Sequence, residues 1–246
     1  MKHKKIIEQL NLQEKALLMS GKDFWTTVDI KRLNIPSIFL ADGPNGLRKQ
    51  KAAADHLGLN ESIKSTCFPT SATLANTWNL HLLETVGSLL GKEAEHEDVS
   101  VILGPGTNIK RNPLGGRNFE YYSEDPYISG KLSSSFIKGI QNNNVAACVK
   151  HFAVNTQETR RMAIDSVVDE RALREIYLTP FEISVKQVNT QSIMASFNKV
   201  NVIYANEHPH LLFDIFRNEW NYEYIIISDW SGNNDLVEAL IQSAEL

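Results

Sequence analysis

Charged and polar residues follow four apolar segments of this 246-residue chain at the point where each segment ends. They are Asp42 after residues 38–41, Lys150 and His151 after 147–149, Asn198 after 194–197, and Asp229 after 225–228. A charge at the tip of a buried strand is costly unless it is paired or used. One strand-end aspartate is equally well explained as a helix cap, but four polar strand ends favour a single active site.

A second group of charges lies in the loop over residues 111–120, which reads RNPLGGRNFE. It can be interpreted as a glycine turn whose charges are solvated. Alternatively, Arg117 is directed at oxygen atoms of a ligand and Glu120 holds it in place.

Several other chemistries are not supported by the spacing of residues. His151 has no second histidine or nearby cysteine at metal-ligand spacing, so we expect no metal. The segment 104–106 (GPG) matches neither a P-loop nor a dinucleotide fingerprint, and no G-x-S-x-G elbow is present. We therefore expect no cofactor.

The composition is that of an ordinary globular protein, with 42% hydrophobic and 22% charged residues. A net charge of −4 offers no electrostatic reason for binding nucleic acid or an anionic membrane. No apolar run approaches the length of a membrane span, and acidic and amide residues interrupt the basic N-terminus. The two cysteines, Cys67 and Cys148, are expected to be buried free thiols in a reducing compartment, which predicts a cytoplasmic location.

The elements that must position the strand-end residues are short apolar strands separated by helices. Continuously apolar runs, typical of strands covered on both faces, predict strands over Ser37–Ala41, Thr70–Ala75, Val99–Gly104, Ala146–Phe152, Ser192–Phe197 and Tyr224–Ser228. Repeated strand-then-helix units predict parallel strands, in either a (β/α) barrel or an open doubly wound sheet. Residues 44–69 and 105–124 are expected to be long loops, which in compact domains tend to be functional.

The helices between these strands have recognisable starts. Asn79 is expected to cap one helix, and Asp125 with Pro126 to begin the next. Asp169 opens a further helical pattern that Pro180 should kink, and residues 212–220 follow helical spacing as well.

In this order, the motifs resemble those of glycoside hydrolase family 3, specifically its β-glucosidase branch. The resemblance rests on residues 18–25 (LMSGKDFW), 40–44 (LADGP), 115–120 (GGRNFE), 123–126 (SEDP), 150–152 (KHF), 194–198 (MASFN) and 228–230 (SDW), with Asn155, residues 157–159 and Arg161. It extends from about Glu14 to the last residue. In the single-domain N-acetylglucosaminidase branch, a histidine follows Lys-His-Phe, whereas the loop 153–161 has none here.

The resemblance implies roles for the matching positions. Asp229 would be the catalytic nucleophile that forms a covalent glycosyl-enzyme intermediate. Residues that would bind the sugar at the cleaved end are Asp42, Arg117, Lys150, His151, Arg161, Met194 and Trp230. The cations Lys150, Arg117 and Arg161 are expected to keep the pKa of Asp229 low.

The resemblance also implies that something is missing. In the β-glucosidase branch the general acid/base comes from a C-terminal α/β domain, whereas this chain ends one helix after Asp229. We therefore expect residues 1–246 to form a (β/α)8-type (TIM-like) barrel domain that lacks its last unit and the C-terminal α/β sandwich domain. Phe197 is a further departure, because many relatives carry tyrosine there.

The sequence thus predicts a retaining β-glucosidase whose substrate is a β-glucoside or a short oligosaccharide. A complementing C-terminal domain or split chain is its expected partner. One alternative is a non-catalytic or degenerate sugar-binding barrel. Another is an unrelated cofactor-dependent barrel, which the lack of a phosphate-binding signature disfavours.

Overall fold

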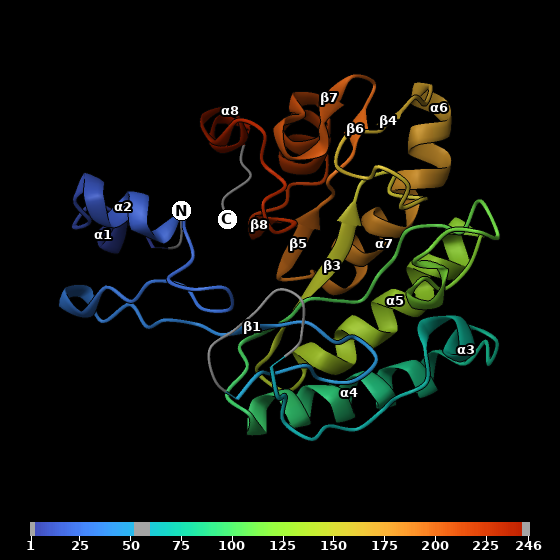
Figure 1. Ribbon diagram of the computed structural model, residues 1–246, viewed down its shortest axis with the longest axis horizontal. Coiled ribbons are helices and arrows are strands. Elements are labelled where there is room, and N and C mark those ends of the chain that lie inside the picture. The colour runs from blue at the N-terminus through green and yellow to red at the C-terminus, as the bar shows by residue number, and fades with distance from the viewer. Residues whose placement is uncertain (1–2, 52–59, 243–246) are drawn as a thin grey trace.

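The computed structural model describes residues 3–51 and 60–242 and has an α/β architecture built on one curled parallel sheet (Figure 1). In spatial order its five strands are β1 (Leu40–Ala41), β2 (Val101–Ile102), β3 (Ala146–Phe152), β5 (Ser192–Ala195) and β8 (Ile225–Ser228). All four strand pairings are parallel. Along the sheet, the strands follow one another in the order of the chain.

The expected α/β class and parallel strands are confirmed, whereas a closed eight-stranded barrel is not. Within the described residues, β1 and β8 lie at opposite ends of the five-stranded sheet. A second, smaller sheet contains β4 (Asp165–Ser166), β6 (Lys199–Val200) and β7 (Ile203–Tyr204). The smaller sheet was not predicted, because its two-residue strands are too short for a periodic pattern.

Helices α4 (Leu80–His96), α5 (Pro126–Gln141) and α7 (Thr179–Val188) cover one face of the main sheet (Figure 1). The predicted caps are confirmed: Asn79 accepts a hydrogen bond from Leu82 N at 3.0 Å, and Asp125 accepts one from Ile128 N at 2.8 Å. Each cap satisfies one of the amide groups that a helix start leaves without a partner. The remaining helical segments of the described chain are α1 (Lys4–Ile7), α2 (Leu12–Leu18), η1 (Lys31–Leu33), α3 (Ser71–Ala75), η2 (Asn118–Glu120), α6 (Glu170–Ala172), η3 (Leu173–Leu178), η4 (Ala205–Glu207), η5 (His210–Glu219) and α8 (Leu236–Ile241).

The predicted distortion near Pro180 is a π-helical turn. Asp169 caps α6, the chain widens into the π-helical segment η3, and α7 then begins with Pro180 in its first turn. Proline has no amide hydrogen, so it cannot donate a backbone hydrogen bond to the preceding turn of the helix. The hydroxyl of Thr179 instead donates to the carbonyls of Arg174 and Glu175.

Two sequence-based expectations are wrong. Residues Thr70–Ala75 form the helix α3, with Thr70 as its N-cap, and not a strand. Their apolar run is too short to distinguish the two structures, and the cap at Thr70 begins a helix. Cys67 is exposed, whereas Cys148 is buried as expected.

The strands β1, β2, β5 and β8 are shorter than predicted. Of the predicted loop 44–69, residues 44–51 and 60–69 contain no helix or strand of the fold, and residues 52–59 lie outside the described residues. The bounds of β3 agree with the prediction, while β2 has two residues where six were expected. The loop 105–124 contains only η2. No helix in the described ranges combines the length and hydropathy that crossing a membrane would need.

Candidate active site

The eight residues singled out in the sequence meet in one pocket of about 360 Å³ at the C-terminal edge of the main sheet. Its lining includes Asp42 after β1, Lys150 and His151 on β3, Met194 on β5, and Asp229 and Trp230 after β8, with Arg117 and Arg161 from loops. Parallel strands end at a common edge, which is why positions far apart in the sequence converge there.

Lys150 lines this pocket and pairs with two acidic side chains. Its side chain is buried, and Nζ lies 2.9 Å from Asp42 Oδ1 and 4.0 Å from Glu120 Oε2. Burial works against its charge, but Asp42 and Glu120 outweigh burial and raise the pKa of Lys150. Burial likewise opposes the charge of Asp42, but Lys150 and then Arg48 keep the pKa of that carboxyl low.

The second group of charges is organised as predicted. Arg117 forms an ion pair through Nε with the buried carboxylate of Glu120, three residues later. The short helix η2 provides this spacing. Burial opposes the charge of Arg117, but Glu120 outweighs it and raises the pKa of the guanidinium. The interpretation of 111–120 as a turn with solvated charges is therefore wrong at this pair.

His151 is almost completely buried and neutral. Its backbone amide donates to Asn108 Oδ1 at 2.7 Å, and Asn108 Nδ2 donates to the His151 carbonyl at 2.8 Å. Burial, and then the nearby Arg117, lowers the pKa of His151 well below its ordinary value. This imidazole can therefore donate or accept a hydrogen bond without carrying charge.

The carboxyl of Asp229 differs from those of Asp42 and Glu120, because no cation of the described chain forms an ion pair with it. Its Oδ2 is buried, has no hydrogen-bond partner in the described chain, and lies 3.9 Å from His151 Nε2. Burial raises the pKa of Asp229, and the attraction of Arg117, Lys150 and Arg161 offsets this only in part. The expectation that these cations keep the pKa low is therefore wrong, because desolvation exceeds their combined effect.

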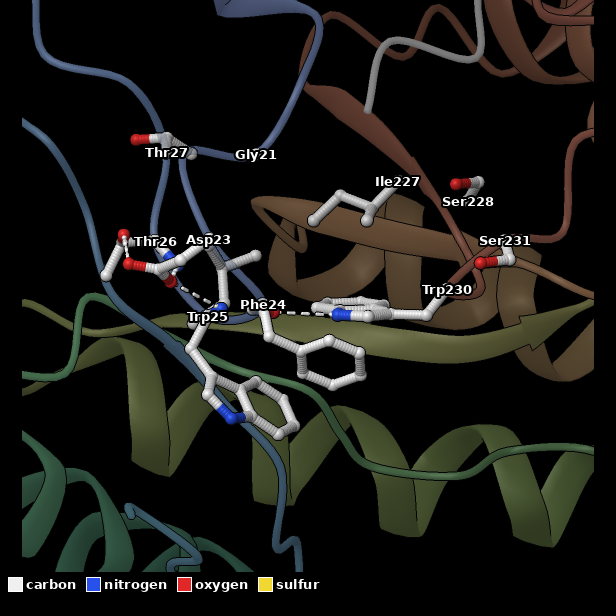
Figure 2. Close-up of a pocket in the computed structure, with 11 residues that line it drawn as sticks. Gly21, Asp23, Phe24, Trp25, Thr26, Thr27, Ile227, Ser228, Trp230 and Ser231 are labelled. Atoms are coloured by element: carbon white, nitrogen blue, oxygen red, sulfur yellow. Dashed lines mark hydrogen bonds between the residues drawn. The ribbon is translucent and has the colours of Figure 1, made fainter. Parts of the chain in front are cut away.

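An aromatic wall formed by Phe24, Trp25 and Trp230 closes one side of the pocket. The indole N–H of Trp230 donates to the carbonyl of Phe24 at 2.8 Å, which links the end of β8 to the N-terminal segment (Figure 2). On this wall the ring centroids of Trp25 and Trp230 are 5.8 Å apart. The same three residues also line a second cavity of about 390 Å³, between residues 21–27 and β8 (Figure 2).

Arg48 is a pocket residue that the sequence analysis missed. It lies 3.4 Å from Asp42 Oδ2, and its guanidinium is 5.8 Å from the Trp25 ring centroid. The loop after Asp42 doubles back through Gly43 and Gly46, whose φ angles of 110° and 151° favour glycine. Two glycines between a strand-end aspartate and an arginine were the signal that could have identified it.

Arg161, one of the residues expected to bind the sugar, is only partly buried. It pairs with Glu158 at 3.0 Å and stacks on Phe197, with its guanidinium 4.7 Å from the ring centroid. The aromatic face of Phe197 therefore holds the Arg161 guanidinium, although Phe197 lacks the hydroxyl of a tyrosine.

Together these groups suit a small polyol. Charged donors and acceptors surround a space next to an aromatic face, and one carboxylate oxygen, Asp229 Oδ2, has no hydrogen-bond partner among the described residues. Hydroxyl groups of a sugar ring could satisfy several donors and acceptors at once, while an indole provides an apolar platform. No cluster of three histidine, cysteine or acidic side chains suited to a metal occurs in the parts of the chain described.

Comparison with known proteins agrees with this chemistry. The model of the glycosyl hydrolase family 3 N-terminal domain matches residues 8–244. Thermostable β-glucosidase B of Acetivibrio thermocellus is 51% identical over 243 residues, covering 99% of this chain and 32% of that protein. An exo-α-(1→6)-L-arabinopyranosidase of Bifidobacterium longum is 45% identical over 93% of this chain and 30% of its own length.

Solved structures are similar over the whole chain. β-Glucosidase 3B of Thermotoga neapolitana in complex with glucose superposes with a TM-score of 0.94 at 43% identity, covering 100% of this chain and 36% of that one. A β-glucosidase of Kluyveromyces marxianus in complex with glucose gives a TM-score of 0.93 at 44% identity, covering 98% of this chain and 28% of that one. The chain therefore spans about a third of the length of the relatives that it matches.

Proposed function

The chain belongs to glycosyl hydrolase family 3, and we propose that its pocket is the sugar-binding and nucleophilic site of a retaining β-glucosidase. Asp229 carries this proposal, because its buried Oδ2 has no hydrogen-bond partner in the described chain and the carboxyl lines a pocket that also contains several donors. A buried group with a perturbed pKa in such a pocket is a candidate for catalysis. Two glucose complexes among the similar structures support glucose as the glycone.

In the proposed reaction, the Asp229 carboxylate attacks the anomeric carbon as the bond to the leaving oxygen breaks. The product is a glycosyl ester on Asp229, which water then hydrolyses with overall retention. Arg117, Lys150 and Asp42 would hold the sugar hydroxyls, and Trp230 would support the ring. The attacking carboxylate must be ionised, so the raised pKa of Asp229 sets the acidic limit of the reaction.

The general acid/base is a second carboxyl that we assign to a part of the enzyme outside the pocket lining described here. A general acid must be protonated before it can act, which calls for a raised pKa. Of the two carboxyls that line the pocket, Asp42 has a lowered pKa and Asp229 is the proposed nucleophile. Glu120 is committed to its ion pair with Arg117.

For the fold, we propose that residues 1–246 contribute most of a (β/α)8-type barrel domain. The curled five-stranded parallel sheet and its match to much longer enzymes support this assignment. A complementing domain, on the same polypeptide or on another, would then supply the acid/base carboxyl.

The proposal is tested by trapping the intermediate. The chain is incubated with 2,4-dinitrophenyl 2-deoxy-2-fluoro-β-D-glucoside, whose leaving group needs no protonation. We expect intact-mass spectrometry to show one added fluoroglucosyl group, and peptide mapping to assign it to Asp229. The matched control, Asp229→Asn, keeps the side-chain shape and should gain no adduct.

The outcomes distinguish the alternatives. Labelling at another residue, or equal labelling of Asp229→Asn, would contradict the nucleophile assignment. Glucose binding by calorimetry without any adduct would favour the non-catalytic sugar-binding protein. Faster reaction with an aryl α-L-arabinopyranoside than with the aryl β-glucoside would change the glycone, as the name of the Bifidobacterium relative allows.

A further inference from the structure

His151 lies between two groups of different hydrogen-bonding character. Its Nδ1 is 3.4 Å from the hydroxyl of Tyr121, and its Nε2 is 3.9 Å from Asp229 Oδ2. A neutral imidazole carries one proton, so one ring nitrogen donates and the other accepts. The neighbour of each nitrogen determines which tautomer is favoured.

The two neighbours favour the same tautomer. An ionised carboxylate can only accept, so a lone pair on Nε2 would face negative charge at 3.9 Å across a buried pocket. The Tyr121 hydroxyl can donate, so it suits an unprotonated Nδ1. Asp229 Oδ2 has no hydrogen-bond partner in the described chain, so a proton on His151 Nε2, 3.9 Å away, would face an oxygen that is free to accept.

The position of the Tyr121 side chain, which its hydrogen bond to His151 requires, is fixed by packing. Its ring is buried, and the rings of Tyr121 and His151 meet edge-on with centroids 6.4 Å apart. A Cβ at Gly106 would come within 3.0 Å of the Tyr121 ring, so this glycine leaves room for the tyrosine. Burial raises the pKa of Tyr121, so its hydroxyl stays protonated and able to donate throughout the neutral range.

The main chain of His151 is fixed independently. Asn108 accepts from the His151 amide and donates to its carbonyl, so the histidine backbone does not depend on Tyr121. Removing the tyrosine hydroxyl should therefore change the imidazole tautomer without moving the β3 backbone.

We propose that Tyr121 is a positioning residue that keeps His151 in the Nε2-protonated neutral tautomer. The Nε2–H then points toward the Asp229 carboxylate and the space above it. A sugar bound there, which rests on the proposed function, would receive this donor at a hydroxyl near the reacting carbon. In the opposite tautomer, a second acceptor would face the carboxylate and that donor would be lost.

The tautomer is measured directly on the 246-residue chain labelled with ¹⁵N-histidine, without sugar, at neutral pH. Long-range ¹H–¹⁵N correlation spectra distinguish a protonated from an unprotonated ring nitrogen, and His151→Gln assigns the signals. We expect a protonated Nε2 and an unprotonated Nδ1. A wild-type spectrum with the proton on Nδ1 overturns the proposal.

Tyr121→Phe tests the cause. We expect the Nδ1–H form to become measurable beside Nε2–H in the variant, because only the Asp229 carboxylate then still favours a proton on Nε2. The matched control is Tyr122→Phe, because Tyr122 is equally buried but its hydroxyl has no hydrogen-bond partner in the described chain, and there the signature should remain. An unchanged tautomer in Tyr121→Phe would show that Tyr121 does not determine it and would overturn the proposal.

Glucose affinity, measured by calorimetry, separates this inference from the proposed function. We expect the dissociation constant to rise roughly 2- to 10-fold in Tyr121→Phe and to stay unchanged in Tyr122→Phe. Absence of glucose binding in the wild type, together with the expected tautomer, would contradict the sugar site alone. Glucose binding together with Nδ1–H in the wild type would contradict the role of Tyr121 alone.

Discussion

The environment of Asp229 destabilises the charge that the proposed reaction needs. Three cations attract its carboxylate, yet its pKa is still raised because burial removes more hydration than they replace. The cations are also engaged elsewhere, since Lys150 pairs with Asp42 and Arg117 pairs with Glu120. The unpaired carboxylate remains available for a ligand, at a cost in stability.

This cost leads to a prediction for Asp229→Asn, which removes the buried charge and keeps the shape. We expect the variant to be more stable than the wild type at pH 7 by about 1 kcal/mol, because function-bearing sites commonly reduce stability by this amount. Urea unfolding followed by circular dichroism measures the difference. Asp29→Asn is the control, because Asp29 is only partly buried, its pairing with Lys22 lowers its pKa, and no gain is expected there.

The pH dependence of that gain has a definite sign. Below about pH 4, the ordinary range of an aspartate, the carboxyl is protonated in both folded and unfolded chains, so the two proteins should be equally stable. As the pH rises, the unfolded carboxyl ionises first, and wild-type stability falls until the folded carboxyl has ionised as well. A gain that is largest at low pH would contradict the raised pKa of Asp229.

At the scale of residues, the sequence predicted which side chains share the pocket, but it did not predict the direction in which the pKa of Asp229 is shifted. The strand ends and the loop 111–120 identified five residues of the pocket, and the family resemblance added Arg161, Met194 and Trp230. The fourth predicted strand-end position, Asn198, is not among the residues that line this pocket. The pKa of Asp229 was predicted in the wrong direction because desolvation depends on the surrounding packing and not on neighbouring residue types. Arg48 was missed because the turn that returns it to Asp42 involves two glycines and not a regular period.

Helices α4 and α5 approach so closely that the contact depends on glycine. A Cβ at Gly139 would lie 2.2 Å from Glu84 O and 2.6 Å from Ser88 N, both backbone atoms of α4. Gly87 on α4 faces Phe136 O in the same way, at 2.2 Å. The close contact brings the buried faces of the two helices together over the strands that carry the site.

We therefore expect Gly139→Ala to destabilise the protein by about 1–3 kcal/mol, since the backbone must move apart to admit the methyl group. The better helix propensity of alanine, about 1 kcal/mol, offsets part of the cost. The midpoint of urea unfolding measures the effect. Gly116→Ala is the control, because its Cβ would meet only the Glu158 side chain, at 3.3 Å; equal loss in both variants would contradict the contact.

The predictability of elements depended on their length and caps. Helices α4 and α5 were predicted from a capping residue followed by a long apolar stripe, and both signals act locally. Residues Thr70–Ala75 were assigned to the wrong type because six residues do not reveal a period. The short strands of the second sheet depend on pairing between distant segments, which no local pattern encodes.

At the scale of the whole molecule, the proposed site contains groups for binding a sugar and for nucleophilic attack, but its described lining contains no group for proton transfer. Donors, an aromatic wall and a carboxylate meet at the C-terminal edge of one sheet. A general acid needs a carboxyl with a raised pKa. Among the pocket-lining groups of the described chain, Asp229, the proposed nucleophile, is the one that meets this condition. His151, whose pKa is strongly lowered, is neutral at neutral pH; its one ring N–H can donate a hydrogen bond, but it is not the imidazolium that could transfer a proton to a leaving group.

Because the described pocket lining contains the proposed nucleophile but no general acid, the reaction rate should depend on the leaving group. A dinitrophenolate leaves without protonation, so Asp229 alone should suffice for its displacement. An alkoxide needs a proton, and losing general acid catalysis costs about 10²–10⁴-fold. For the 246-residue chain, we expect burst release of dinitrophenol from the aryl glucoside and almost no cleavage of methyl β-glucoside.

The measurement is a series of aryl β-glucosides of decreasing leaving-group acidity, with Asp229→Asn as the blank. The logarithm of the glycosylation rate should fall steeply with leaving-group pKa, because no proton reaches the departing oxygen. In an enzyme with its acid in place, protonation compensates for a poor leaving group and flattens this dependence. A flat dependence in this chain would mean that a proton donor already lies within reach of the pocket, and it would contradict the assignment of the acid/base to another part of the enzyme.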